Sequence, residues 1–316
     1  MTSKKIIVVF GATGAQGGGV ARAILNDPNS EFAVRAVTRD PNSDKAKELA
    51  KMGAEVVAGE IDDMQSLKRV LSGAYGAYFV TFFWAHFSPE KEKTEAKNMA
   101  QAAKEAGLKH VIWSTLEDTR KYVPLDDNRM PTLMEKYKVP HLDAKGESDQ
   151  YFIDAGVPVT FLVTSFYWEN MIYFGMGPKR GADGKLAITF PMGNKKLSGI
   201  AAEDIGKCAY GIFKRGHELI GKRVGIAGEQ IACNEMAQVL TKTLGKEVSY
   251  NEITPEQYRN LGFPGADDLG NMFQFFRDFE EDLSRTRDVK FTKELDPELK
   301  SFEKWVAENA ELIPLD

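Results

Sequence analysis

Three glycines with a regular spacing carry the clearest chemical signal in the sequence. Gly11, Gly14 and Gly17 come directly after the apolar run Lys5–Phe10, and the amphipathic segment Val20–Leu25 follows them. A turn without side chains lets backbone N–H groups and a helix N-terminus approach a pyrophosphate. A strand, a glycine turn and a helix in this order predict a dinucleotide site, and an ordinary structural turn is the alternative. The residues expected around the phosphates are Gly11, Ala12, Thr13, Gly14, Ala15, Gln16 and Gly17.

The end of the second predicted strand indicates NADP(H) as the dinucleotide. An acidic side chain at this place would bind the ribose hydroxyls of NAD and repel a 2′-phosphate. The sequence has Arg39 here, whose guanidinium can hold a phosphate through two hydrogen bonds, and Thr38 or Ser43 can add a hydroxyl. Asp40 stands one position later, so NAD stays open as the alternative. Arg39 as an ordinary surface charge is the other alternative.

A proton donor for reduction is less easily found. The spacing of the three glycines resembles that of short-chain dehydrogenases, which usually reduce carbonyls with a Tyr-x-x-x-Lys pair on one helix, in which the lysine lowers the tyrosine pKa. After the fifth predicted strand the chain has His141 at the tyrosine position and Lys145 four residues later. We expect His141 to be a cap or surface residue. The literal match Tyr210 to Lys214 falls after the sixth strand, and we interpret it as an ordinary helix face.

Composition excludes several other functions. The net charge of -5 arises from 46 acidic and 41 basic residues, and no basic stripe suggests nucleic-acid binding. The two cysteines, Cys208 and Cys233, and three of the histidines lack metal-ligand spacing, so we expect no metal site. Cys208 is expected in the core. The first apolar run is too short for a signal peptide, and no segment is long and apolar enough to span a bilayer. We expect no membrane association.

Six short apolar runs, separated by segments with helical spacing, must position these groups. They are Lys5–Phe10, Phe32–Thr38, Ala54–Ala58, Ala77–Val80, His110–Ser114 and Val157–Leu162. Such alternation predicts an α/β fold, a Rossmann-type doubly wound parallel sheet, with a smaller mixed α/β C-terminal lobe. We expect an NADP-binding Rossmann domain over 1–163 and the smaller lobe over 164–316, with some segments of the lobe rejoining the main sheet. Helices are predicted to begin after Ser88, after Thr254 and at Asp296.

With these residues in place, the chain resembles the NmrA-like family of atypical short-chain dehydrogenases, and in particular its animal NADPH-sensor branch. The resemblance extends almost end to end. Its local motifs are Val8–Gly18, Val37–Pro41, Gly53–Val57, His141–Glu147 and Leu261–Ala266. A lysine position of the family in the helix after Ser88 is Thr94 here, so Lys93 or Lys97 is the candidate to replace that contact.

The resemblance implies roles for further residues around the cofactor. It implies that Glu60 and Ile61 approach the adenine, and that Thr81, Phe82 and Phe83 pass the ribose. It places Lys145 at the nicotinamide side, and Tyr167, Trp168, Glu169 and Asn170 over the nicotinamide. Related reductases use a lysine without the tyrosine, so Lys145 is both a cofactor contact and the candidate catalytic acid or base, with the cofactor contact favoured.

Two functions follow as expectations. The first, which the missing tyrosine favours, is a non-catalytic NADP(H) sensor that reports the NADPH/NADP+ state to a regulatory protein partner. The second is an NADPH-dependent reductase of a quinone or small aromatic or carbonyl compound. We expect a cytoplasmic protein that can also enter the nucleus, and a homodimer is compatible with the fold.

Overall fold

The computed structural model describes residues 4–181 and 183–315, and the chain forms two compact units that alternate along the sequence. Unit 1 contains the chain up to Asp118, Ala144–Thr164 and Glu203–Val224. Unit 2 contains Thr119–Asp143, Ser165–Ala202 and the chain from Gly225 onward. One crossing between the units falls at 164/165, beside the boundary expected at 163/164. A single boundary does not describe two segments: 119–143 precedes it but belongs to unit 2, and 203–224 follows it but belongs to unit 1.

Unit 1 is built on a seven-stranded sheet with the order β11-β6-β5-β4-β1-β2-β3. Its strands are β1 (Lys5–Val9), β2 (Phe32–Thr38), β3 (Glu55–Ala58), β4 (Gly76–Phe79), β5 (His110–Thr115), β6 (Val159–Val163) and β11 (Arg223–Gly225). Strands β1 to β6 pair in parallel. The predicted Rossmann-type α/β fold is therefore confirmed. The strands lie within two residues of the apolar runs that predicted them, because a strand covered on both faces is apolar on both.

The direction in which strands are added reverses beside β1. The chain proceeds from β1 to β2 and β3 on one side, then crosses to β4 on the other side. In open α/β sheets, ligands bind outside the carboxyl ends of the strands at such a reversal. The glycine turn follows β1 at this point, since Val9 pairs with Ala36 of β2 and with Tyr78 of β4.

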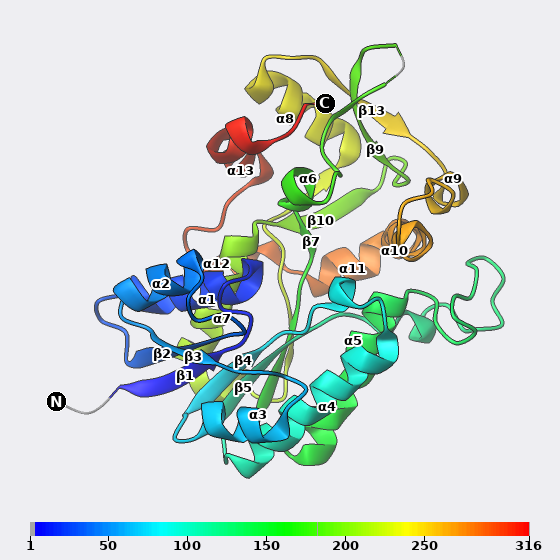
Figure 1. Cartoon of the computed structure of the whole chain (residues 1–316). Coiled ribbons are helices and arrows are strands. Elements are labelled where there is room, and N and C mark those ends of the chain that lie inside the picture. The colour runs from blue at the N-terminus through cyan, green and yellow to red at the C-terminus, as the bar shows by residue number, and fades with distance from the viewer. Residues whose placement is uncertain (1–3, 182, 316) are drawn as a thin grey trace. The chain divides into compact units, whose positions relative to one another are not determined.

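Helices cover both faces of this sheet (Figure 1). They are α1 (Ala15–Leu25), α2 (Asp44–Lys51), α3 (Met64–Leu71), α4 (Pro89–Glu105), α5 (Pro140–Ala155) and α7 (Ala202–Arg215), with the short 3-10 helices η1 (Phe83–Ala85) and η3 (Gly216–Leu219). Leu67 of α3, Met99 of α4 and Phe152 of α5 join Phe79 and Trp113 of the sheet in one buried core cluster.

Helices α1 and α7 meet at two glycines. A Cβ added to Gly206 would lie 2.1 Å from the carbonyl carbon of Gly19, so only glycine permits this approach. Cys208 of α7 is fully buried, as expected for a core residue. Helix α4 begins as predicted, with the Ser88 hydroxyl accepting a hydrogen bond from Lys91 N at 3.2 Å.

Unit 2 contains two three-stranded sheets and most of the short helices. One sheet has the order β12 (Glu229–Ala232), β10 (Lys196–Ile200), β7 (Phe166–Tyr167), and the other β13 (Val248–Glu252), β9 (Leu186–Phe190), β8 (Lys179–Arg180). Its helices are η2 (Thr119–Lys121), α6 (Asn170–Tyr173), α8 (Cys233–Leu244), α9 (Pro255–Arg259), α10 (Ala266–Asp278), α11 (Glu280–Thr286), α12 (Val289–Leu295), α13 (Phe302–Asn309) and η4 (Ala310–Leu312). The expected mixed α/β character of this part is confirmed.

Two helix starts were predicted in unit 2, and one of them is wrong. The capping box at Thr254 is present: its hydroxyl accepts from Gln257 N, and the Gln257 side chain accepts from Thr254 N. No helix begins at Asp296. That residue ends α12, and its carboxylate accepts from Glu298 N in a turn at 3.0 Å. The next helix starts at Phe302, and the hydroxyl of Ser301 caps it. The prediction at Asp296 failed because an aspartate followed by proline forms a turn as readily as it begins a helix.

Candidate dinucleotide site

The glycine turn after β1 has the backbone form that a phosphate site needs. Gly11 has φ +63°, a conformation that favours glycine, and its carbonyl accepts a hydrogen bond from Gly14 N at 2.8 Å. A Cβ at Gly17 would lie 2.4 Å from the carbonyl oxygen of Phe10. Gly14 is the N-cap residue of α1, and no side chain caps the first turn of that helix. The N–H groups at such a helix start bind anions.

The side chain of Gln16 is held from two strands. Its Oε1 accepts hydrogen bonds from Tyr78 of β4 and, at 2.8 Å, from the hydroxyl of Ser114 at the end of β5. These bonds attach the start of α1 to the carboxyl edge of the sheet. The Ser114 hydroxyl is therefore engaged within unit 1.

The loop after β2 presents a basic side chain. Arg39 is exposed, and no partner for its guanidinium is found in the described part of the chain. The Asp40 carboxylate accepts from Asn42 N at 2.9 Å, and the Ser43 hydroxyl donates to the Asp40 carbonyl at 3.0 Å. The Thr38 hydroxyl accepts from Asp40 N at 3.3 Å. Asp40 therefore has a local role in the turn, which leaves the positive charge of Arg39 as the main charge offered to a ligand.

The residues expected near adenine and ribose follow the next two strands of the same edge. Glu60 is exposed after β3, and its N–H donates to the Ser66 hydroxyl at 3.1 Å. Ile61 is half-buried against the core cluster. After β4, Phe83 is buried, whereas 57% of Phe82 is exposed. Unit 1 thus brings these predicted positions to one edge of its sheet, and their contact with a nucleotide stays a prediction.

Lys145, on α5, lies in a buried polar cluster. Its Nζ contacts Glu92 Oε1 of α4 at 2.7 Å, the Thr81 hydroxyl at 2.6 Å and the Thr81 carbonyl at 3.2 Å. The Thr81 hydroxyl in turn donates to Glu92 Oε1 at 2.5 Å. Nζ also lies 5.3 Å from the ring centre of Trp113. An ammonium group has three N–H donors, so these three acceptors satisfy all of them.

Helix α5 is anchored so that Lys145 reaches this position. The Asp149 carboxylate accepts from Trp113 Nε1 at 3.0 Å and from the Thr115 hydroxyl at 2.6 Å. Burial nevertheless raises the pKa of Asp149, because desolvation outweighs these bonds and Arg223. A Cβ on Gly146 would lie 2.4 Å from the backbone N of Asp118, so glycine is required directly after the lysine.

Two more side chains of unit 1 extend the polar cluster. Glu95 lies one turn after Glu92, and His86 Nε2 is 3.6 Å from Glu92 Oε2 and 3.9 Å from Glu95 Oε2. The three could surround a metal ion by distance alone. However, His86 Nδ1 accepts a hydrogen bond from Ser88 N at 3.1 Å, which places the proton of a neutral imidazole on Nε2. A metal would need the Nε2 lone pair, so we interpret the trio as a proton-bearing group.

Glu92 and Glu95 are functional candidates that were not among the site residues predicted from the sequence. Glu92 shares its helix face with Ala96, Met99 and Ala103, all buried. Carboxylates at Glu92 and Glu95 on an otherwise apolar face predict a buried partner, because an unpaired buried charge is costly. That signal identifies Glu92 from spacing alone, although not Lys145 as its partner.

The two alternatives to a lysine acid are otherwise engaged. Tyr210 donates to the Asp27 carboxylate at 2.7 Å, and burial raises its pKa to about 12, the reverse of an activated tyrosine. His141 is buried in the first turn of α5, and its Nδ1 lies 2.7 Å from Asp268 Oδ1. The expectation of a cap or surface position for His141 is therefore wrong. Asp268 is 127 residues away in the sequence, so no local pattern indicated the pair.

The segment expected over the nicotinamide belongs to unit 2. Trp168 is fully buried and packs against Phe302 and Trp305. The Glu169 carboxylate accepts from Ala202 N at 2.8 Å and from Trp305 Nε1 at 3.0 Å. Both side chains are therefore engaged within unit 2, and the contact of Tyr167, Trp168, Glu169 and Asn170 with a nicotinamide stays a prediction.

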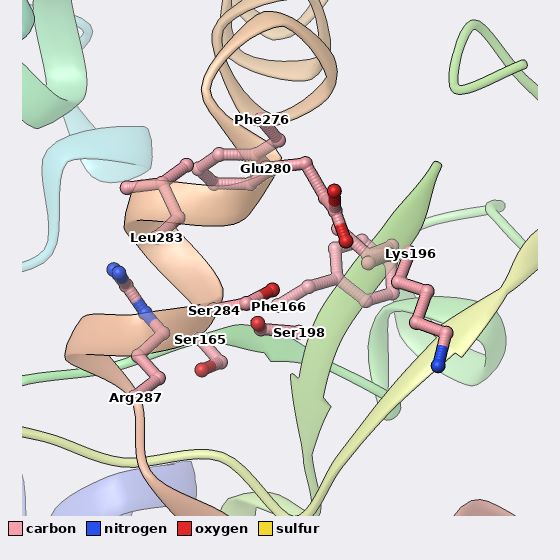
Figure 2. Close-up of a pocket in the computed structure, with 10 residues that line it drawn as sticks. Ser165, Phe166, Lys196, Ser198, Phe276, Glu280, Leu283, Ser284 and Arg287 are labelled. Carbon is pink, nitrogen blue, oxygen red and sulfur yellow. The ribbon is translucent and has the colours of Figure 1, made fainter. Parts of the chain in front are cut away.

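Unit 2 also contains a cavity of about 20 Å³ (Figure 2). Its walls come from β7, β10 and α10–α11, with Ser165, Ser198 and Ser284 around it. A space of this size admits a water molecule and no more. It cannot hold a nicotinamide or an aromatic substrate.

A parallel sheet that reverses at a glycine turn, with a basic side chain after the second strand, defines a protein with a Rossmann-type nucleotide-binding fold. The chain belongs to the NmrA-like family, which matches residues 3–306. Within residues 4–181 and 183–315, no helix has both the length and the apolar character needed to cross a membrane.

Three known proteins are similar to this chain. An NmrA-like family domain-containing protein of Dictyostelium discoideum is 30% identical over 264 residues, covering 81% of this chain and 82% of its own. An NAD(P)H azoreductase of Xenophilus azovorans is 27% identical, covering 82% of each chain. The negative transcriptional regulator NmrA, solved with NADP, shares the fold with a TM-score of 0.78 at 22% identity, over 97% of this chain and 95% of that one. NmrA has also been solved with NAD.

Proposed function

We propose that this protein binds NADP(H) and reports the NADPH/NADP+ state to a regulatory protein partner without turning over a substrate. The nucleotide would lie along the carboxyl edge of unit 1, with its pyrophosphate at the glycine turn and its 2′-phosphate at Arg39. The observation that carries the non-catalytic part is the state of Lys145, whose three N–H donors are all used inside the chain. Membership of the animal NADPH-sensor branch and residence in cytoplasm and nucleus belong to the same proposal.

The NADP preference rests on charge. Arg39 is exposed and can pair with a 2′-phosphate, whereas the Asp40 carboxylate accepts a hydrogen bond within its own turn and keeps its negative charge. A sensor also needs a different affinity for the two redox states, or for the bound and empty protein, since only a differential affinity can shift a conformational equilibrium.

A second candidate is reduction of a quinone or small aromatic compound with NADPH. The exposed ring of Phe82, directly after Thr81, favours it, because a planar substrate could stack there beside Lys145. The azoreductase relative is consistent with such chemistry. In that case the hydride would come from the nicotinamide, and Lys145 or solvent would supply the proton.

One experiment separates the two functions. NADPH binding is first measured by calorimetry, and nicotinamide absorbance is then followed with a panel of quinones and aldehydes. If the protein is a sensor, it should bind NADPH but oxidise it at well below about 1 per second, which is an ordinary enzyme rate. Turnover above that rate, lost in Lys145→Ala with binding retained, would establish the reductase instead. Lys104→Ala, an exposed lysine near the end of α4, is the matched control.

A further inference from the structure

Glu92 and Glu95 place two buried carboxylates beside a single buried cation. Glu92 is fully buried, and its Oε1 receives Lys145 and Thr81. Its Oε2 has no hydrogen-bond partner among the described residues and points toward His86 Nε2. Glu95 is 8% exposed and lies one helical turn further along α4. The arrangement therefore contains one more carboxylate than Lys145 can neutralise.

The other charged groups facing Glu95 do not remove this excess. Lys91 lies 3.9 Å from Glu95, but its Nζ also pairs with Asp62 at 3.1 Å, on the exposed side of the cluster. His86 is kept neutral, since burial lowers its pKa. Desolvation, followed by the charges of Glu92 and Asp62, raises the pKa of Glu95 to about 7. Near neutral pH the cluster holds one exchangeable proton.

Lys145 connects this proton to the nucleotide edge. All three of its donors are occupied, so a ligand oxygen can be bound only if one acceptor inside the chain is released. Release of the ion pair with Glu92 leaves two adjacent carboxylates with less positive charge near them. Two like charges so close in a buried site favour uptake of a proton.

We propose that Glu92 and Glu95 form a proton store coupled to the nucleotide through Lys145, so that binding of NADP(H) is accompanied by uptake of a proton. The proton comes from the buffer, and no covalent bond of the nucleotide changes. Glu92 acts as the positioning residue for Lys145, and Glu95 is the main holder of the proton. This inference rests on the proposed NADP(H) site, and it makes the protein responsive to pH as well as to the nucleotide.

The sign of the effect follows from linkage. If binding raises the affinity of the pair for a proton, rising pH must weaken nucleotide binding. A shift of about one pH unit from a starting value near 7 gives uptake of about half a proton near pH 7.5, and affinity about fivefold lower at pH 8 than at pH 6.

The test is calorimetry of NADPH binding from pH 6 to 8.5 in pairs of phosphate-free buffers with different ionisation enthalpies, PIPES and imidazole at the lower pH values and HEPES and Tris at the higher ones. The wild-type protein should take up protons with a maximum between pH 7 and 8. Glu95→Gln mimics the protonated side chain, so it should bind without proton uptake and with a flat pH dependence. Glu90→Gln, on the exposed side of the same helix, should behave as wild type.

The possible results distinguish a failure of the proton coupling from a failure of the proposed NADP(H) binding. Wild-type binding without proton uptake, or uptake that persists in Glu95→Gln, overturns the coupling and leaves the NADP(H) site intact. Absence of NADPH binding at every pH removes the proposed function, and the coupling with it. The pH profile of the wild-type protein is a test by itself. Proton uptake that does not peak between pH 7 and 8 contradicts Glu95 as the group that takes up the proton.

Discussion

The glycine turn and the Lys145 cluster lie at the same edge of one sheet, but they differ in whether their hydrogen-bond donors are free to bind a ligand. The three glycines leave no side chain between the backbone of the turn and a ligand. The first N–H groups of α1 are also not capped by a side chain. The cluster is filled, since every N–H of Lys145 already has an acceptor. The first region can bind an anion as it stands, whereas the second must exchange an internal bond for a ligand bond. Affinity should therefore depend on the turn, and the response to ligand on the cluster.

The cluster should be the part whose disruption costs most. In Glu92→Ala the ammonium of Lys145 loses its buried counter-charge, and removing one partner of a buried pair typically costs about 3–5 kcal/mol. We expect a loss of that size in the free energy of unfolding, measured by urea denaturation. The double variant Glu92→Ala with Lys145→Met should regain part of it. A single variant within about 1 kcal/mol of wild type would show that the cluster is solvated.

The turn should be less costly in stability but decisive for binding. The Cβ of Gly17→Ala would meet the backbone oxygens of Phe10 and Gly11 at 2.4 and 2.5 Å, so the turn must shift, at about 1–3 kcal/mol. NADPH affinity measured by calorimetry should fall at least about 100-fold, as expected when several phosphate contacts are lost. Gly14→Ala is the graded control, because its nearest contact is 3.2 Å. Equal affinities in the two variants would contradict a backbone cradle.

Glu95 should give an effect that depends on pH. Its folded pKa of about 7 lies above the ordinary 4.5, so the unfolded chain releases this proton first, and wild-type stability falls as pH rises from 4.5 to 7. Glu95→Gln has no such loss. It should match wild type near pH 4 and exceed it by about 3 kcal/mol at pH 8, in parallel denaturation curves. A constant difference between the two proteins at all pH values would contradict a buried proton.

The same contrast explains what the sequence could predict. The strands of unit 1 and the glycine turn are local features, written in continuous apolar runs and in a spacing of three. Gly11 and Arg39 were identified because each directly follows a strand, and Lys145 was identified by its spacing of four residues from His141 and by the family resemblance. Glu92 is 53 residues from Lys145 in the sequence, and Thr81 is 64 residues from it. Only the packing of the helices on the sheet brings these three side chains together.

Unit 2 was predicted less well for a related reason. Its strands are short and its chain leaves and re-enters unit 1, so no alternation of strand and helix marks its borders. His141 was placed at the surface because its partner, Asp268, lies in a distant helix. The helix expected at Asp296 failed because a cap residue followed by proline predicts a turn and a helix start with nearly the same signal.

Arg39 is the residue on which the proposed NADP site depends most, and the nucleotide preference of an Arg39→Asp variant tests that site most directly. Calorimetry with NADPH and NADH should show that the wild-type protein binds NADPH more tightly. Arg39→Asp should weaken NADPH by about 100-fold and change NADH by less than about threefold, because two charge-assisted bonds to the 2′-phosphate are lost. Lys45→Asp, an exposed residue of α2 with the same charge change, should alter both nucleotides little. Equal losses for NADPH and NADH in Arg39→Asp would contradict an NADP site at the end of β2.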